Sequence, residues 1–283
     1  MKPTLFELFG FKVPSYSVLM VLGYLVALAS IFYLTPKGGD DRKGELSRAQ
    51  VWDLYIVMVV SSILGSKIGH VLFEAPGHRG KEGQIIHSLP ELLVDDPWHW
   101  ARLGEAGYVW YGGMIGALLT AVFYFYRRPH LRAALYSDAF APAIMLGACV
   151  GRLGCLMAGC CYGQPTDVPW AMSFPGVAGL VHPTQLYDSL VALTLGLYLL
   201  FRFPKRRFDG ELIASLLIGY GVLRGFTESF RGDPERGTFG PLSTSQLLSI
   251  PMVTSGVYLW VRLSKKPAAA GPTPVSETPS QAT

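Results

Sequence analysis

The feature that most constrains this chain is a series of seven long apolar runs separated by polar segments. Each run has about the 17 to 25 residues that an α-helix needs to cross a bilayer. The runs are residues 13–34, 51–73, 108–126, 137–157, 185–203, 211–230 and 244–263. Only 16% of the residues are charged, well below the roughly 25% of an ordinary soluble domain. The sequence therefore predicts an all-α integral membrane protein with seven transmembrane helices.

The lysines and arginines between the apolar runs predict how these helices are oriented. If the N-terminus is outside, the cytoplasmic segments carry fourteen of these cations and the outer segments seven. Cytoplasmic loops are enriched in Lys and Arg. We therefore expect a periplasmic N-terminus and a cytoplasmic C-terminus. The first run is too long for the apolar part of a cleavable signal peptide, so we interpret it as the first span.

Residues 1–266 are predicted to form one transmembrane domain with two longer segments on its outer side. The first, residues 74–107, contains two tryptophans and is a candidate cap, because tryptophan favours the membrane interface. The second, residues 159–184, contains no Lys or Arg. The tail, residues 267–283, is rich in Pro, Ala, Ser and Thr and is predicted to be disordered in the cytoplasm.

Charged side chains within and directly after the sixth apolar run indicate a site in the membrane. Tyr220, Arg224, Glu228 and Arg231 have spacings that place them on one face of a helix. An arginine at mid-bilayer costs at least ~2.5 kcal/mol, so it needs a partner or a function. Two interpretations are open: an Arg–Glu pair that joins two helices, or a site for a polar or anionic group.

A second intramembrane arginine, Arg152, lies among glycines near the outer end of the fourth run. Gly147 and Gly151 have the GxxxG spacing that lets helix backbones approach closely, and Gly154 follows. The planar guanidinium can bind two oxygens of a phosphate. The alternative is an arginine that extends its head to the membrane surface.

The four cysteines, Cys149, Cys155, Cys160 and Cys161, lie within 13 residues of one another. We interpret them mainly as small packing residues at a helix end. A zinc site has weak support, because Cys160 and Cys161 are adjacent and the nearest histidine in the following sequence is His182. We expect no metal and no cofactor.

Four segments together resemble motifs of the prolipoprotein diacylglyceryl transferase family, in the same order. They are residues 151–163, the HPTQLY sequence at 182–187, residues 219–231, and residues 242–251. The resemblance implies transfer of an sn-1,2-diacylglyceryl group from phosphatidylglycerol to the lipobox cysteine thiol of a prolipoprotein signal peptide. A thioether forms and glycerol 1-phosphate leaves. The implied location is the bacterial inner membrane, with membrane lipids and these two substrates as partners and no nucleic acid.

The resemblance also implies roles for individual residues. Arg152 and Arg224 would hold the phosphate, and His182 would position the outer loop. The implied catalytic residues are Arg224, Tyr111, Tyr220 and Glu228. The implied substrate-binding residues are Arg152, Arg224, Tyr16, Gly151, Gly154, His182 and Arg231.

The chain departs from the family pattern at one group of positions. Cys155, Ala158 and Cys160 stand where the family has Asn, Asn and Glu, and Tyr111 stands where it has His. Tyrosine, with an unperturbed pKa of roughly 10, is a poorer base than histidine. The cysteines are then either packing residues or an activated thiolate near Arg152. Two further functions stay open: a paralogue with the same phospholipid site but another acceptor, and a non-catalytic phospholipid-binding protein.

Overall fold

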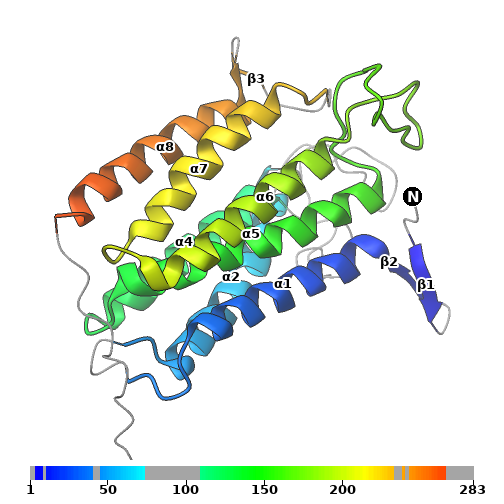
Figure 1. The fold of residues 1–283 in the computed structure, drawn as a ribbon. Helices are drawn as coiled ribbons and strands as arrows, with labels where there is room; N and C mark the ends of the chain where they lie inside the picture. The colour runs from blue at the N-terminus through cyan, green and yellow to red at the C-terminus, as the bar shows by residue number, and fades with distance from the viewer. Residues whose placement is uncertain are drawn as a thin grey trace, which may run out of the picture. The chain divides into compact units, whose positions relative to one another are not determined.

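The computed structural model describes residues 4–8, 11–40, 45–73, 109–232, 238–239 and 242–265, and seven long α-helices account for most of them (Figure 1). The helices are α1 (Ser15–Leu34), α2 (Arg48–Phe73), α4 (Trp110–Arg127), α5 (Ala133–Ala158), α6 (Thr184–Arg202), α7 (Glu211–Glu228) and α8 (Thr244–Leu263). Each coincides with one predicted run to within a few residues. The candidate cap at 74–107 and the tail at 267–283 lie outside the described residues.

Short strands accompany the helices, which the all-α prediction did not include. β1 (Thr4–Leu8) pairs with β2 (Phe11–Pro14), and β3 (Thr238–Phe239) pairs with β4 (Leu242–Ser243), both antiparallel. The predicted start of the first span at residue 13 is therefore wrong by two residues. Pro14 has an extended backbone with φ −66° and ψ 135°, and α1 begins immediately after it.

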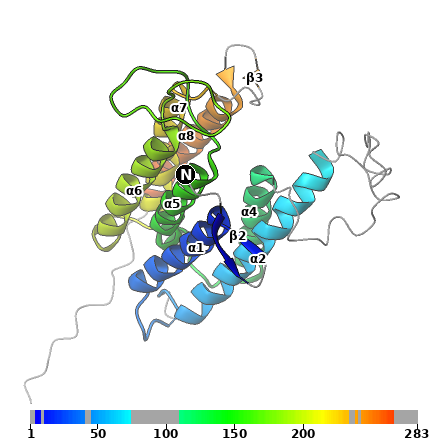
Figure 2. The same cartoon turned by 90° about the vertical axis from the view of Figure 1, so that its right-hand side faces the viewer.

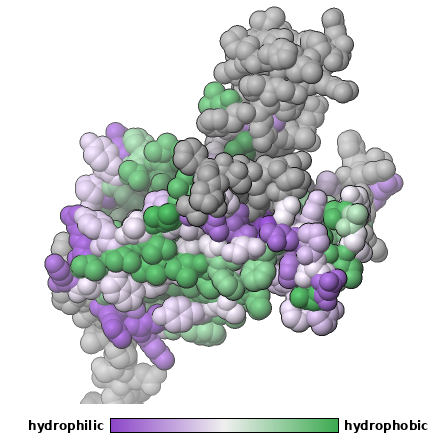
Figure 3. Space-filling model, turned by 90° about the horizontal axis from the view of Figure 1, so that it is seen from above, coloured by the Kyte–Doolittle hydropathy of each residue, from purple (hydrophilic) through white to green (hydrophobic). Residues whose placement is uncertain are grey.

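Four of the helices are long and apolar enough to cross a membrane. Their apolar stretches are Ser15–Leu34, Arg48–His70, Ala133–Ala158 and Thr184–Lys205. Large apolar side chains lie on the surface of the helices, and Figure 3 shows extended apolar areas on one face of the molecule. Polar side chains such as Asp138, Thr184 and Gln185 are completely buried instead. Apolar side chains on the helix surfaces, with polar groups paired inside, are expected when lipid surrounds the helices.

The chain forms two compact units, residues 36–133 and residues 1–35 with 134–283. In the first, α2 and α4 pack through glycines. A Cβ added to Gly65 would lie 2.4 Å from the carbonyl oxygen of Gly112, and one added to Gly116 would lie 2.5 Å from that of Ser61. Only glycine permits this approach, which explains the GxxxG spacing of Gly112 and Gly116.

The second unit contains α1, α5, α6, α7 and α8, with α7 and α8 side by side in both views (Figures 1 and 2). Helix α1 approaches α5 where a Cβ on Gly23 would lie 2.9 Å from the carbonyl oxygen of Gly147. At Gly151 the nearest atom to such a Cβ is the Met20 sulfur at 3.5 Å. The close approach predicted for Gly147 and Gly151 is therefore tight at the first glycine and looser at the second.

A buried carboxylate joins α5 to the beginning of α7. Asp138 accepts hydrogen bonds from the backbone N–H groups of Gly210 (2.7 Å), Leu212 (2.9 Å) and Ile213 (3.0 Å). The first N–H groups of a helix have no partner within that helix. Asp138 thus caps α7 from a different helix and fixes the two helices relative to each other.

Candidate functional site

One carboxylate in the second unit contacts three arginines. Asp188 is in the first turns of α6, and its Oδ2 atom lies 3.3 Å from Nη1 of Arg152, 3.7 Å from Nη1 of Arg224 and 3.7 Å from Nη1 of Arg231. Arg152 comes from α5, Arg224 from α7, and Arg231 from just beyond α7. The structure therefore brings together three of the predicted site residues, which we call the arginine cluster.

Arg224 is held from several directions. Its Nη2 atom lies 2.9 Å from Glu228 Oε2 and donates a hydrogen bond of 3.1 Å to Ser245 Oγ on α8. Its Nη1 atom donates to Thr227 Oγ1 at 3.4 Å. The Arg224–Glu228 pair lies within α7, so it does not join two helices as one interpretation had it. Asp188 and Ser245 make the links from Arg224 to the neighbouring helices.

Arg231 reaches the cluster by a different route from the predicted one. The sequence placed it on a helix extending to residue 230, but α7 ends at Glu228. The chain then leaves the helix because Arg231 forms a β-bridge with Gly163, and Gln164 Nε2 donates to the Arg231 carbonyl at 3.2 Å. The loop at residues 159–184 thus fixes the backbone of Arg231. The Arg231 side chain, 4% exposed, lies against Asp188.

Five charged side chains of the described residues meet at the arginine cluster. Three guanidinium groups face the two carboxylates of Asp188 and Glu228, which leaves an excess of one positive charge among these five residues. Arg152 is the most accessible of the three arginines, with its side chain 24% exposed, against 11% for Arg224. A phosphodiester carries one negative charge, and guanidinium groups bind its oxygens well. The cluster therefore has the charge and donors of an anion site.

His182 belongs to an aromatic group that holds the outer loop. Its Nδ1 atom lies 3.0 Å from the Tyr187 hydroxyl, to which Trp170 Nε1 donates a bond of 2.6 Å. The ring of Phe230 makes edge contacts with both His182 and Tyr187. These contacts join the loop to the start of α6 and the end of α7. The positioning role expected of His182 stays a prediction.

Two further predicted residues, Tyr220 and Tyr16, lie in the same compact unit as these groups. Tyr220 lies close enough to Arg152 and Arg224 to interact electrostatically with both. Tyr16 of α1 packs over Gly154, where an added Cβ would lie 3.3 Å from its Cδ2 atom. Tyr111 is on α4 in the other compact unit, and its catalytic role stays a prediction.

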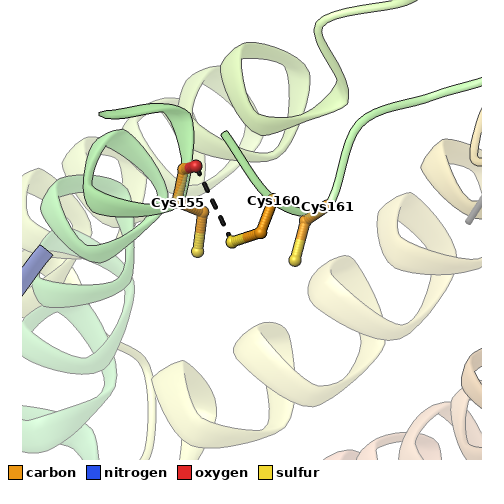
Figure 4. Close-up of side chains that lie close together, drawn as sticks. All are labelled: Cys155, Cys160 and Cys161. Atoms are coloured by element: carbon orange, nitrogen blue, oxygen red, sulfur yellow. Dashed lines mark hydrogen bonds between the residues drawn. The ribbon is translucent and has the colours of Figure 1, made fainter. Parts of the chain in front are cut away.

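The four cysteines separate into two kinds. Cys149 lies within α5, where its Sγ atom is 3.2 Å from Ser189 Oγ on α6, as expected of a packing residue. The Sγ atoms of the other three, Cys155, Cys160 and Cys161, all lie within 4.8 Å of one another. Figure 4 shows their thiols pointing to the same side of the turn. We call these three residues the cysteine cluster.

The surroundings of Cys161 favour its thiolate form. Hydrogen bonds from the Cys155 and Cys160 thiols, with the nearby guanidinium groups of Arg231 and Arg152, lower the pKa of Cys161 below its usual range. Sequence reasoning missed the proximity of these thiols because it depends on the turn after α5. That turn has Gly159 at φ 76° and Cys161 at φ 64°, which linear spacing does not reveal.

Sequence reasoning also missed Asp188. The signal was present, because Asp188 is an ionisable residue in the run at 185–203, and such residues need partners in a membrane. Thr184 and Gln185, both buried, were missed as well. They donate to the carbonyl oxygens of Cys161 at 2.7 Å and Cys160 at 2.6 Å.

Comparison with known proteins identifies the family. A family model described as prolipoprotein diacylglyceryl transferase matches residues 3–262. The chain is 32% identical over 265 residues to the phosphatidylglycerol–prolipoprotein diacylglyceryl transferase of Clostridium tetani, a match that covers 92% of this chain and 97% of that protein. It is 34% identical over 254 residues to the protein of the same name from Bordetella avium, covering 87% and 89%. The chain belongs to the prolipoprotein diacylglyceryl transferase family.

Proposed function

We propose that this protein transfers the sn-1,2-diacylglyceryl group of phosphatidylglycerol to the lipobox cysteine thiol of a prolipoprotein. The observation that carries the proposal is the arginine cluster around Asp188, with its excess of one positive charge. The names of the matched relatives refer to the same two substrates. Among the described residues, Arg152 and Arg224 are the groups we assign to the lipid phosphate.

The chemistry of the transfer explains why an arginine cluster is needed. The thiol loses its proton, and the thiolate attacks the sn-3 carbon of the diacylglyceryl group. The carbon–oxygen bond breaks, and its electron pair stays on the phosphate as glycerol 1-phosphate leaves. Donors placed around the phosphate stabilise this developing charge. Glu228 holds Arg224 in position, and Tyr220 supplies a hydroxyl near both arginines.

The proposed setting is the bacterial inner membrane, with seven spans, the N-terminus outside and the C-terminus in the cytoplasm. Support comes from the match of all seven helices to the apolar runs and from the distribution of Lys and Arg. In this orientation the arginine cluster lies near the outer ends of α5 and α7. The headgroup of an outer-leaflet phospholipid and a signal peptide crossing the membrane both reach that level. Residues 1–266 form the transferase domain in this proposal.

The test is complementation of bacteria depleted of their own transferase, together with a thiol-lipidation assay on purified protein. We expect the wild type to restore lipoprotein modification. Arg152→Ala and Arg224→Ala should each lower transfer at least ~100-fold, the effect of removing one preorganised donor to developing charge. Tyr111→Phe tests whether a catalytic hydroxyl is needed. Failure of the wild type in both assays would refute the proposal.

A second function is favoured by the cysteine cluster. Cys155 and Cys160 stand where the family motif has Asn and Glu, and their thiols lie close to that of Cys161. A paralogue that uses the same phospholipid but another acceptor would have this pattern. Lipid and lipoprotein mass spectrometry of a deletion strain distinguishes the two. Unchanged lipoproteins with altered phospholipids would favour the paralogue.

A further inference from the structure

We propose that Cys155, Cys160 and Cys161 form a three-thiolate site for Zn²⁺ that leaves a fourth position open for the acceptor thiol. The metal site is argued from the geometry of the described residues. The role of the open position rests on the proposed function. The spacing of the cysteines in the sequence predicts neither the metal site nor its open position, because Cys160 and Cys161 are adjacent.

The distances suit a single metal ion. The three Sγ atoms lie within 4.8 Å of one another. A tetrahedral zinc ion with bonds of about 2.3 Å to sulfur places its ligand sulfurs roughly 3.8 Å apart. Binding therefore requires each pair to close by about 1 Å or less, which side-chain rotation supplies. Cys160 is exposed, so an ion and a further ligand can reach the cluster.

The backbone of the turn is fixed by groups outside the cluster. Among the residues that the structure describes, Cys161 is the non-glycine residue with positive φ, at 64°. Residues held in this conformation gather at functional sites, where the surrounding structure maintains them. The Cys160 N–H donates to the Cys155 carbonyl at 3.2 Å. Thr184 Oγ1 and Gln185 Nε2 donate to the Cys161 and Cys160 carbonyls, so these two carbonyls are held from outside the cluster. The Cys160 thiol donates to the Cys155 carbonyl, with 3.7 Å between sulfur and oxygen, and it would leave that bond to bind a metal (Figure 4).

The charged groups around the cysteine cluster are also compatible with a bound zinc ion. Three thiolates with Zn²⁺ carry a net charge of −1. Arg152 and Arg231 both interact electrostatically with Cys161, so the cluster lies beside cations that favour thiolate ligands. Three thiolates with an open fourth position are the ligand arrangement of a zinc ion that still binds a substrate group. Zinc prefers sulfur ligands to the carboxylate oxygens nearby.

An open zinc position would supply the thiol activation that Tyr111, a poorer base than the histidine of the family pattern, supplies less well. The acceptor thiol binds there as a thiolate, because coordination to zinc removes its proton, which passes to solvent. The coordinated sulfur then attacks the sn-3 carbon of the diacylglyceryl group, and the carbon–oxygen electron pair leaves with glycerol 1-phosphate. The thioether product is a weaker ligand and dissociates. Arg152 lies close enough to both clusters to keep the phosphate near the attacking sulfur.

The metal site is tested without reference to activity. Full-length protein is purified under reducing conditions, loaded with Zn²⁺, dialysed and analysed for metal by mass spectrometry. We expect about one zinc per chain in the wild type and in Cys149→Ser, and loss of zinc in Cys155→Ser, Cys160→Ser and Cys161→Ser. Cobalt should give sulfur-to-metal charge-transfer bands in the same pattern. No bound zinc, binding of copper alone, or a disulfide within the cluster in protein isolated from cells would overturn the site.

The acceptor role has a separate readout. Removing the metal with a chelator should lower thiol lipidation at least ~100-fold while phosphatidylglycerol binding is retained, and added Zn²⁺ should restore transfer. If zinc binds but its removal leaves transfer unchanged, the acceptor role is wrong. If the zinc-loaded wild type shows no transfer with any prolipoprotein peptide, the proposed function fails, and the metal stoichiometry still decides the site.

Discussion

At the scale of single residues, Asp188 organises the site. It is 7% exposed, and its carboxylate contacts arginines from three segments of the chain. Three guanidinium groups packed without it would repel one another in a medium of low dielectric constant. The negative charge of Asp188 brings them together but leaves an excess positive charge for a phosphate. We therefore interpret Asp188 as a positioning residue that acts through Arg152 and Arg224.

The substitution Asp188→Asn tests this interpretation. Removing one partner of a buried ion pair costs about 3–5 kcal/mol, because the remaining charge stays buried. We expect lower thermal stability and at least a ~10-fold loss of transfer. The KM for phosphatidylglycerol should rise, because the arginines lose their alignment. Added phosphate should stabilise the variant more than the wild type, since an anion replaces the lost carboxylate.

Asp167→Asn is the matched control for Asp188. Asp167 is an exposed residue of the outer loop. Its neutralisation should leave both stability and KM close to wild type. Equal effects of the two substitutions would mean that Asp188 contributes only to the net charge of the outer face.

The residues that sequence analysis found were those with a clear energetic penalty. Arg152 and Arg224 stood out because an arginine in an apolar run needs a partner, and the structure places both against Asp188. Arg231 was found for a wrong reason, since it lies beyond α7 and not on its face. Its position depends on a pairing with Gly163, a residue 68 positions earlier in the chain, which no local pattern reports.

At the scale of elements, α5 connects a structural end to a functional end. Near its beginning, Asp138 caps α7, and near its other end it carries Arg152 and Cys155. The length of the helix was predictable, because the apolar run sets it. The cap of α7 by Asp138 was not predictable, because nothing in the sequence around Gly210 indicates that its backbone N–H donates to a residue of another helix. The hairpin of β1 and β2 was missed because the apolar run appeared to begin before Pro14.

The cap of α7 is tested with Asp138→Ala. Leaving a buried N–H without an acceptor costs roughly 1–3 kcal/mol. Asp138 accepts hydrogen bonds from three backbone N–H groups. We expect the midpoint of thermal unfolding in detergent to fall by at least ~4 °C. Asp209→Ala, at an Asp whose ion pair with Arg206 spans 3.6 Å, should have a smaller effect. A fall no larger than that of Asp209→Ala would contradict the capping role.

The outer loop is tested at Gly163. A Cβ there would lie 2.5 Å from the Phe230 carbonyl oxygen and 2.6 Å from the His182 Cβ atom, so Gly163→Ala must displace one of them. The expected cost is about 1–3 kcal/mol, with faster proteolysis of residues 159–184 and lower transfer. Gly38→Ala is the control, because no atom lies within 4 Å of the Cβ it adds. Unchanged proteolysis of the loop in Gly163→Ala would show that this close contact is not required.

At the scale of the whole molecule, the orientation in the membrane decides whether the two clusters face the substrates. The proposed function needs the acceptor thiol at the outer surface, and with seven spans only a periplasmic N-terminus places the turn after α5 on that side. The excess of Lys and Arg on the opposite side supports this orientation. The number of helices matters equally, because adding or removing one span would reverse every segment that follows it.

Reporter fusions test this orientation directly. A phosphatase that is active only in the periplasm should be active when fused within residues 159–184 and inactive when fused after residue 265. A fluorescent protein that folds only in the cytoplasm should give the opposite pattern.

Labelling of Cys160 by a membrane-impermeant thiol reagent in intact cells, with the more enclosed Cys149 as control, gives the same information without a fusion. Phosphatase activity at the C-terminus would place the clusters on the cytoplasmic side. A transfer reaction on exported prolipoproteins would then be excluded, because the arginines could not meet the outer-leaflet phospholipid.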